Sequence, residues 1–406
     1  MHCLEDYKDI VGVKIIGDIH KKASKLYGKH VLHINSTYQG GGVAEILNSL
    51  VPLMNDVGLD AGWRILHGNP DFFSITKKFH NALQGEPVHF TAIKEKLYMQ
   101  ANEDFSSFTH IDHDCVIVHD PQPLPLIKYY KKRQPWIWRC HVDLSNPDDQ
   151  IWEYLTTFIL RYDALILSNE KYRKDDLPVD QRIIYPAIDP LTLKNVDIPD
   201  KGAIQYLKKF GVEMDKPIVI QISRYDKWKD PEGVTRVFEL VKKKVDCRLL
   251  LCGNVATDDP EGHEIYEKVK EAAKDLIKTG DVILMTDPVC SNHFFINALQ
   301  RISSVIVQKS IREGFCLAVT EALWKETPVV ASNIGGIPLQ IKDGENGFLV
   351  EPNDDQGFAD RIVEILQNPD LATELGKKAK EVVRERFLIT RLLSDYLDLL
   401  KDVISA

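Results

Sequence analysis

The sequence has few cysteines, and they are not arranged as a covalent or metal-bound scaffold. Its 406 residues include seven cysteines, an odd number scattered along the chain without a Cys-x-x-Cys pair. This set predicts neither a disulfide framework nor a zinc site. Most of the cysteines lie in apolar runs, where a buried free thiol behaves as a small hydrophobic side chain. We therefore expect all seven to serve packing.

Long apolar runs and an excess of positive charge are also absent. No stretch approaches the length of about 18 apolar residues that a membrane-spanning helix needs, and residues 1–10 are acidic where a signal peptide would be basic and then apolar. Fifty-one Lys and Arg stand against 60 Asp and Glu, a net charge of -9, which provides no positive field for polyanions. We expect no membrane or nucleic-acid partner and a cytoplasmic location.

What the sequence does contain is enough apolar material for more than one folded core. Hydrophobic residues make up 44% and charged residues 27% of the chain, and its length indicates two or three domains. From Lys29 onward, short β-branched runs alternate with amphipathic stretches, a pattern typical of parallel sheets with crossover helices. The predicted strands are 30–35, 61–66, 115–120, 136–140, 163–168 and 182–186 in a first series, and 217–223, 247–253, 282–285, 304–308, 328–332 and 347–351 in a second.

A segment rich in proline and aspartate, residues 185–200, separates the two series and predicts a domain boundary. We therefore predict an α/β protein with two doubly wound, Rossmann-like domains facing across a cleft. Ligands of such sheets bind beyond the carboxyl ends of the strands, so functional residues should follow strands. The last stretch, 371–406, has a continuously helical pattern.

Three glycines, Gly40, Gly41 and Gly42, follow the first predicted strand. Without side chains they let backbone amides and a helix N-terminus approach an anion. The spacing matches neither the G-x-G-x-x-G of a dinucleotide site nor the G-K-[ST] of a P-loop. A tight turn without a ligand explains the glycines equally well.

Two cations, Arg224 and Lys229, lie five residues apart in the loop that follows the first strand of the second series. Arginine binds phosphate oxygens in bidentate fashion and lysine acts as a point charge, so the pair is suited to a diphosphate. The alternative is a solvated charge run in which Asp226 and Asp230 are the partners.

Two carboxylates, Glu313 and Glu321, follow a strand at a spacing of eight residues. Eight helical residues rise about 12 Å, which exceeds the roughly 5 to 9.5 Å of a glycosidase pair. Hydrolysis by this pair is therefore disfavoured, whereas the amides of Gly314 and of Phe315 could face a phosphate at the helix start. The alternative is an exposed helix with ordinary salt bridges.

Histidines also end or follow strands in the first series. His119 precedes Asp120, and His141 follows a strand directly, so either imidazole could donate to a sugar hydroxyl. A structural histidine is the commoner explanation at such positions. Asp112 and Asp114 resemble a metal-nucleotide motif, but they precede their strand and so belong to the wrong edge of a parallel sheet.

Taken together, these features resemble a nucleotide-sugar glycosyltransferase of the GT-B fold, in family 4 of the retaining enzymes. The resemblance spans nearly the whole chain and includes the glycine loop, the 223–230 loop, the Glu313 to Glu321 pair, and the later segments NIGGIP (333–338) and DGENGFLV (343–350). The segments VHDPQPLPL (118–126) and WRCHVDLSNP (138–147) look most like trehalose synthases that join a nucleoside diphosphate glucose to glucose. Trehalose phosphorylases carry comparable segments.

The resemblance implies roles for the candidate residues. Arg224 and Lys229 would hold the donor diphosphate, with Gly41 and Gly42 close to it and the Gly314–Phe315 turn at the helix start. Glu321 would bind the ribose hydroxyls and Glu313 the hydroxyls of the transferred glucose. His141 would contact the donor sugar near its 6-hydroxyl. Asp120 with Gln122 would position the acceptor glucose.

The resemblance further implies a first domain of residues 1–190 that binds the acceptor, joined by a C-terminal helix at about 384–406, and a donor-binding domain of residues 191–383. The implied reaction moves glucose from UDP-glucose or ADP-glucose to glucose with retention, by front-face attack, and yields α,α-trehalose. No cofactor is expected, and a divalent metal is compatible but not implied. A homodimer is compatible as well. The rival functions are a trehalose phosphorylase, a nucleotide-sugar epimerase of similar fold, and a silent sugar-binding protein.

Overall fold

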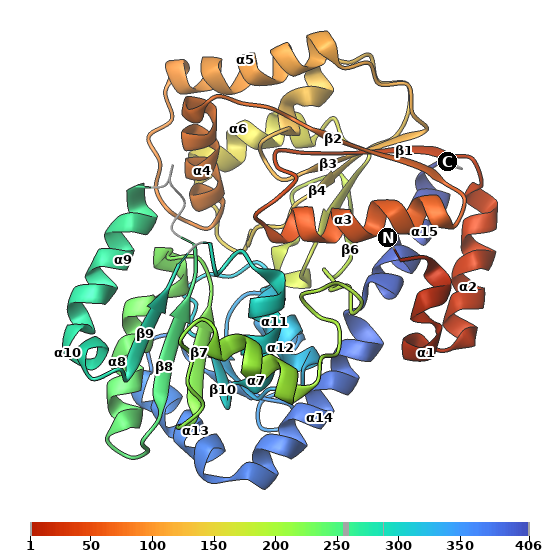
Figure 1. The fold of residues 1–406 in the computed structure, drawn as a ribbon. Helices are drawn as coiled ribbons and strands as arrows, with labels where there is room; N and C mark the ends of the chain where they lie inside the picture. Colours follow the sequence, from red (N-terminus) through yellow and green to blue (C-terminus); the bar gives the residue numbers. More distant parts are fainter. Residues whose placement is uncertain (1, 255–259, 287, 405–406) are drawn as a thin grey trace. The chain divides into compact units, whose positions relative to one another are not determined.

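The chain forms two compact units, each built on its own sheet. The computed structural model describes residues 2–254, 260–286 and 288–404. The first unit comprises Met1–Ala187 with Phe387–Ala406, and the second comprises Ile188–Arg386. Figure 1 shows the first unit in red to yellow with a blue final helix, and the second in green to blue. The chain first passes between the units inside the proline- and aspartate-rich segment.

The first unit contains a six-stranded sheet in the order β2-β1-β3-β4-β5-β6, with every pair parallel. Its strands are rich in Val, Ile and Leu, and all residues of β3 are buried, as expected when helices cover both faces of a parallel sheet. The strands are β1 (His30–Asn35), β2 (Asp60–Ile65), β3 (Cys115–His119), β4 (Trp136–Arg139), β5 (Ala164–Leu167) and β6 (Asp180–Ile183).

Helices on the two faces of this sheet contact different sets of strand residues, because successive side chains of a strand point to opposite faces. One face packs in a single core with α4, α5 and α6, which supply Phe72, Tyr98 and Leu155. On the other face α15 contacts α2 and α3, and the Tyr396 ring of α15 lies 6.0 Å from that of His33 on β1. The helices are α1 (Lys8–Val11), α2 (Val13–Ala23), α3 (Gly42–Asp56), α4 (Pro70–Leu83), α5 (Ala92–Phe108), α6 (Asp149–Ile159) and α15 (Ile389–Ile404).

The second unit repeats this architecture with a sheet in the order β12-β11-β10-β7-β8-β9, again entirely parallel. Its strands are β7 (Ile218–Ile222), β8 (Arg248–Cys252), β9 (Val282–Met285), β10 (Val305–Gln308), β11 (Val329–Ser332) and β12 (Phe348–Val350). Each of the twelve strands in the described residues overlaps one of the twelve predicted strands, with the largest offset at β6, which was predicted over 182–186. The predicted α/β class with two doubly wound sheets is confirmed.

Helices α8, α9 and α13 share one core with the second sheet, while α11 contacts α7, α12 and β7. Asp230 caps α8 by accepting a hydrogen bond from the Gly233 amide at 2.9 Å, with Pro231 at the first helical position. The helices of this unit are α7 (Asp200–Lys208), α8 (Pro231–Lys242), α9 (Pro260–Ala272), α10 (Lys274–Lys278), α11 (His293–Ile302), α12 (Leu317–Trp324), α13 (Asp355–Gln367) and α14 (Pro369–Arg386).

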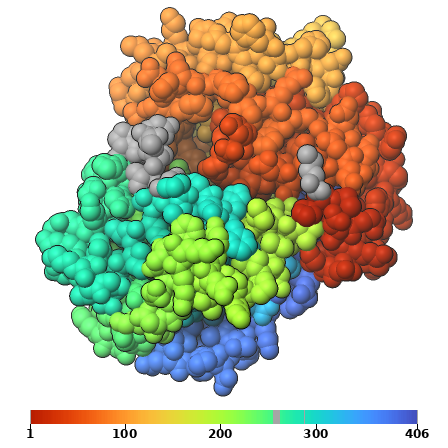
Figure 2. Space-filling view, viewed as in Figure 1, coloured from red at the N-terminus to blue at the C-terminus, as the bar shows by residue number. Residues whose placement is uncertain are grey.

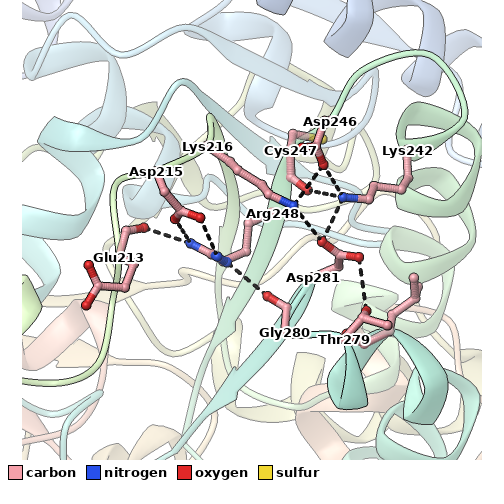
Figure 3. Close-up of polar contacts among 11 residues, drawn as sticks. Glu213, Asp215, Lys216, Lys242, Asp246, Cys247, Arg248, Thr279, Gly280 and Asp281 are labelled. Carbon is pink, nitrogen blue, oxygen red and sulfur yellow. Dashed lines mark hydrogen bonds and ion pairs between the residues drawn. The ribbon is translucent and has the colours of Figure 1, made fainter.

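An ion-pair network joins the amino ends of β7, β8 and β9 (Figure 3). Asp281 accepts from Lys242 at 2.7 Å and from Lys216 at 3.4 Å. Both lysines also reach Asp246, and the Lys242 hydrogen bond holds the pKa of Asp281 below its usual value. The network therefore ties three strands together at the sheet edge where they begin.

The surface of the first unit includes the long helix α5, which forms part of the orange region at the top of Figure 2. Ile93 and Phe108, near its two ends, are 74% and 93% exposed, whereas Tyr98 and Asn102 are buried. Among the helices that the structure describes, none is both long enough and apolar enough to cross a lipid bilayer.

Two sequence-based expectations were wrong: a continuous helix at the end of the chain, and a packing role for all seven cysteines. The predicted continuous helix over 371–406 is interrupted, because α14 ends at Arg386 and α15 begins at Ile389. The interruption coincides with the passage back to the first unit, and the side chains of Phe387 and Leu388 are fully buried there.

The expectation that all seven cysteines are free also fails. Cys252, at the end of β8, forms a disulfide with Cys290, and their Cα atoms lie 5.9 Å apart, a normal separation for such a bond. The two cysteines are 38 residues apart, so their proximity depends on the β8–β9 pairing and not on local spacing. The other five cysteines are free, and four of them are buried, as predicted.

Candidate functional site

Each sheet reverses its winding direction at one point, and the candidate residues follow the strands at those points. In the first sheet the reversal lies between β1 and β3, and in the second between β7 and β10. The loops after such strands form the usual ligand site of a doubly wound sheet. The glycine turn follows β1, His119 ends β3, Arg224 and Lys229 follow β7, and Glu313 follows β10.

The loop after β7 is held by backbone and side-chain hydrogen bonds that orient Lys229. The Asp226 carboxylate accepts from the Trp228 amide at 2.9 Å at the start of a short 3-10 turn, Lys227–Lys229. Gln221 on β7 donates to the Lys229 carbonyl at 2.7 Å. The Trp228 carbonyl accepts from the Ile311 amide at 2.7 Å, which joins this loop to the one that carries Glu313.

Lys229 and Glu313 form an ion pair across these two loops. The side chains are only 18% and 11% exposed, and Ser310 donates a further hydrogen bond to the Glu313 carboxylate at 3.3 Å. Burial is the largest single effect and by itself would lower the pKa of Lys229, but the charge of Glu313, its hydrogen bond to Lys229 and the nearby Cys316 together raise that pKa. Lys229 is therefore a permanent cation at neutral pH.

Arg224 has a different environment, although it belongs to the same loop. Its side chain is 53% exposed, and its guanidinium contacts Asp226 at 3.3 Å. The guanidinium therefore keeps most of its donors in solvent, where an anionic ligand can reach them. The structure brings Arg224, Lys229 and Glu313 to one edge of one sheet, as the sequence predicted.

Lys309 supports this cluster and was missed by the sequence reasoning. It is 1% exposed and pairs with Asp230 at 2.7 Å and Asp355 at 2.9 Å. Asp230, which follows Lys229, has the left-handed backbone angle φ 44, so the ion pair helps to stabilise an unfavourable conformation. Lys309 could have been predicted from its position directly after β10, the strand that precedes Glu313.

The turn before α12 places Gly314 and Phe315 at a helix start that has no side-chain cap. Gln340 donates to the Phe315 carbonyl at 2.5 Å. Gly336, in the NIGGIP segment, packs against this turn so closely that an added Cβ would lie 2.6 Å from the Gly314 oxygen and 2.7 Å from the Phe315 Cα. Glycine at position 336 is therefore required by the shape of the turn.

Glu321 lies on α12 but has none of the contacts of Glu313. It is 1% exposed, and its carboxylate pairs with Lys194 at 2.8 Å and accepts from Gln300 at 3.3 Å. The alternative of an exposed, salt-bridged helix is thus wrong for this residue. The sequence reasoning missed Lys194 and Gln300, which contact Glu321, the residue predicted to bind ribose.

In the first unit, the glycine turn is the start of α3. Gly40 has φ 80, which favours glycine, Gly41 is the N-cap without a side-chain hydrogen bond, and Gly42 is the first helical residue. A Cβ at Gly40 or Gly41 would meet no atom within 4 Å, so the space beside the turn is open. An anion could approach the amides at this helix end.

His141 and Asp120 lie together beyond β3 and β4. The Asp120 carboxylate accepts from the His141 amide at 2.8 Å, and Asp120 itself has φ 63. Burial raises the pKa of Asp120 to about 6, against the opposing effect of the His141 amide. Gln122 accepts from Asn102 through its carbonyl at 3.1 Å, and among the described residues its buried Oε1 has no partner.

His33 and Arg139 are buried polar residues next to His141 that the sequence reasoning missed. His33 and His119 are 0% and 1% exposed and hydrogen-bonded to each other at 3.0 Å, and His119 contacts His141 at the same distance. Arg139 ends β4 and is 1% exposed. The alternation of β1 could have identified His33, because it places this residue on the face opposite Leu32 and Ile34.

The discounted pair Asp112 and Asp114 lies at the amino edge, as predicted. Asp114 accepts from Lys29 and from the His30 amide, each at 2.8 Å. Across the described part of the chain, no group of three or more His, Cys, Asp or Glu side chains could hold a metal ion.

Comparisons with known proteins identify both units. Residues 33–174 match the family model "Trehalose synthase, N-terminal domain", and residues 204–382 match "Glycosyl transferases group 1". The trehalose synthase of Thermococcus litoralis is 45% identical over 402 residues, which cover 98% of this chain and 96% of that protein. The trehalose phosphorylase of Pleurotus pulmonarius is 27% identical over 94% of this chain but only 58% of its own length.

A solved structure supports the fold. The α,α-trehalose-phosphate synthase (UDP-forming) from Burkholderia xenovorans superimposes with a TM-score of 0.74 at 13% identity, covering 92% of this chain and all of that one. The two units thus have the GT-B fold of glycosyltransferases. With the near full-length identity to trehalose synthases, the chain belongs to the trehalose synthase family of glycosyltransferases.

Proposed function

We propose that this protein transfers glucose from UDP-glucose or ADP-glucose to free glucose and forms α,α-trehalose with retention. The observation that carries the proposal is the cluster of Arg224, Lys229 and Glu313 at the reversal point of the second sheet. Family membership supports the trehalose product, and the paired cations support a diphosphate leaving group.

Arg224 and Lys229 are suited to the charge that develops in this reaction. Breaking the anomeric C–O bond places negative charge on the departing diphosphate, and fixed donors stabilise that charge in the transition state. Lys229 supplies a partly buried ammonium group and Arg224 an exposed guanidinium. The amides at the Gly314–Phe315 turn and at Gly41 and Gly42 would add helix N-termini to the same diphosphate.

The sugar hydroxyls would be bound by carboxylates and by histidine. We assign Glu313 to the transferred glucose, Glu321 to the ribose, and His141 to a hydroxyl near position 6. Lys194 contacts one oxygen of the Glu321 carboxylate and Gln300 the other, and each oxygen keeps a second lone pair that a ribose hydroxyl would use. Asp120 and Gln122 are assigned to the acceptor glucose, and the free Oε1 of Gln122 offers one hydrogen-bond acceptor.

Retention would follow from front-face attack, in which the acceptor oxygen bonds to the anomeric carbon on the side that the diphosphate leaves. The leaving phosphate oxygen takes the acceptor proton, so no separate general base is needed. Substituting the diphosphate cations should therefore reduce turnover more than substituting any single carboxylate at the acceptor.

The test is an incubation of the protein with UDP-glucose or ADP-glucose, each with and without glucose, followed by NMR identification of the disaccharide and its anomeric configuration. We expect α,α-trehalose only when the acceptor is present. Conversion of the sugar nucleotide without acceptor would favour the epimerase. Glucose 1-phosphate from trehalose and phosphate, with no nucleotide, would favour the phosphorylase.

The variant Glu321→Ala provides a second test that distinguishes a nucleotide-dependent transferase from a phosphorylase. Weaker binding of UDP or ADP in this variant is expected from the ribose assignment, whereas a phosphorylase would be indifferent to the loss. Glu364→Ala, on the exposed side of α13 where the carboxylate pairs with Arg361 at 2.8 Å, serves as the matched control. An unchanged nucleotide affinity in Glu321→Ala would remove the ribose assignment.

A further inference from the structure

Three histidines of the first unit form one continuous row across neighbouring strands. His33 lies on β1, His119 ends β3, and His141 follows the end of β4. His33 Nδ1 lies 3.0 Å from His119 Nε2, and His119 Nδ1 lies 3.0 Å from His141 Nε2. The rings stack with centroid separations of 5.3 and 5.4 Å. One hydrogen-bonded path therefore runs from the buried His33 to the candidate sugar ligand His141.

Each imidazole in this row is neutral and so carries a single proton. Burial lowers the pKa of all three, to about 3 for His33 and well below the usual value for His119 and His141. The buried Arg139 guanidinium lowers the pKa of His119 and His141 further. Three rings thus share three protons, of which two occupy the two hydrogen bonds.

The position of the third proton depends on the direction of the two bonds. If the bonds point inward, so that His141 donates to His119 and His119 donates to His33, then His33 Nε2 carries a proton. If they point outward, His33 Nε2 is a bare lone pair, and the third proton is on His141 Nδ1. His33 Nε2 is buried, and among the described residues it has no hydrogen-bond partner.

The outward direction is the more stable one, because it places the N–H that lies outside the row on His141, which is partly exposed, and not on His33 Nε2, which is buried without an acceptor among the described residues. His33 then donates from Nδ1 to His119 Nε2, and His119 donates from Nδ1 to His141 Nε2. Donation in one sense along the row also lets each bond polarise the next. His141 is left with its proton on Nδ1.

We propose that His33 and His119 are positioning residues that fix His141 as the Nδ1–H tautomer, so that it presents a hydrogen-bond donor to its ligand. Insofar as the ligand is a hydroxyl of the transferred glucose, this rests on the proposed function. The tautomer itself does not, because it follows from contacts within the first unit. The row therefore sets the polarity of one contact with the sugar.

The direct test is ¹⁵N NMR of histidine-labelled protein without ligand. Coupling patterns distinguish protonated from bare ring nitrogens, and loss of one spin system in His141→Gln assigns His141. We expect a protonated Nδ1 and a bare Nε2 on His141. A protonated Nε2 would overturn the proposal, and this measurement on the unaltered protein needs no variant of the row to fold.

Two substitutions of His33 test whether the row is the cause. His33→Asn keeps a donor near the position of Nδ1, whereas His33→Phe keeps a ring but removes the donor. We expect His141 to retain its tautomer in His33→Asn and to show a mixture of both in His33→Phe. If the His141 spectrum is identical in His33→Phe and the unaltered protein, the row does not set the tautomer.

Kinetics separate this inference from the proposed function. Loss of one neutral hydrogen bond to the sugar corresponds to roughly a 2- to 12-fold fall in kcat/KM for His33→Phe, with His33→Asn close to the unaltered protein. If trehalose forms but His141 carries its proton on Nε2, the inference alone fails. If His141 is the Nδ1–H tautomer and no glucose is transferred from any nucleotide, the proposed function alone fails.

Discussion

Lys229 retains its charge inside the second unit because the Glu313 carboxylate lies against it. Lys229→Met would remove the cation from the proposed diphosphate site, with an expected fall in kcat/KM of roughly 10- to 100-fold. It would also leave Glu313 buried without its partner, which costs about 3–5 kcal/mol of unfolding free energy. Initial rates and urea unfolding measure the two effects.

The double variant Lys229→Met/Glu313→Gln separates these effects. Removing the carboxylate charge should restore most of the stability but none of the activity. Lys227→Met is the matched control, because Lys227 lies in the same turn and its ammonium group lies 5.1 Å from the centroid of the Trp228 ring. Full activity in Lys229→Met would contradict the diphosphate assignment.

Asp120 makes a pH-dependent contribution to stability. Its pKa is about 6 in the folded protein against 3.8 for the free side chain, so the folded state holds the proton more tightly. Stability should therefore fall as the pH rises from about 4 to 6. Asparagine also tolerates a positive φ. In Asp120→Asn the decrease in unfolding free energy over this pH range should be smaller by up to about 3 kcal/mol.

The comparison uses urea unfolding of both proteins at a series of pH values from 4 to 7. Other groups titrate equally in the two proteins, so the difference between the curves reports Asp120. Curves that run parallel across this range would show that Asp120 has an ordinary pKa.

The individual candidate residues were easier to predict from the sequence than the residues that they contact. Arg224, Lys229, Glu313 and His141 each follow a strand, which is a local signal. The partners depend on tertiary contact: Lys229 and Glu313 are 84 residues apart, and His33 and His119 are 86 apart. No local pattern joins residues over such separations.

At the scale of elements, the strands were the most predictable part of the chain. Runs such as VIVQ and RLLLC are apolar because both faces of each sheet are covered, and this leaves a strong signal. The break between α14 and α15 was not predictable, because both flanks are amphipathic and the cause is the return of the chain to the first unit. The Cys252–Cys290 disulfide was missed since it depends on strand pairing.

The contact between the NIGGIP segment and the turn before α12 gives an element-scale prediction. Gly336→Ala would place a methyl group against backbone atoms at 2.6 and 2.7 Å, which must displace the Gly314–Phe315 turn. We expect a loss of about 1–3 kcal/mol in stability and weaker binding of UDP or ADP. Thermal unfolding and calorimetric titration measure these quantities.

Gly202→Ala is the control for this substitution. Gly202 lies in α7, and a Cβ there meets no atom within 4 Å. Alanine should therefore stabilise the helix by roughly 0.5–1 kcal/mol and leave nucleotide binding unchanged. Equal behaviour of the two variants would show that the close approach at Gly336 does not shape the turn.

At the scale of the whole molecule, the first unit is discontinuous in sequence, because α15 returns to it after the second unit is complete. Leu392, Leu393, Tyr396, Leu397 and Leu400 of α15 are buried. Burying each of these side chains stabilises the fold by roughly 1.5–3 kcal/mol, so together they contribute on the order of 10 kcal/mol to the free energy of unfolding. This is comparable with the stability of a whole domain.

Truncation after Arg386 should therefore unfold the first unit and spare the second. We expect the truncated chain to lose transfer activity, to expose the 1–187 region to protease, and to keep affinity for UDP or ADP. Limited proteolysis with mass spectrometry and calorimetric titration check these outcomes. A protease-resistant 1–187 region would show that α15 is dispensable for the first unit.

The homodimer remains a prediction. Light scattering should give twice the 46.3 kDa of one chain if it forms in solution.

The ion-pair network in Figure 3 lies at the opposite end of β7 from Arg224 and Lys229. Lys216, Lys242 and Asp281 hold the strands where they begin, whereas Arg224 and Lys229, the proposed diphosphate ligands, follow β7 where it ends, about 17 Å away for five residues of strand. Substitutions in the network should therefore change the thermal stability of the second unit without touching the residues that follow β7.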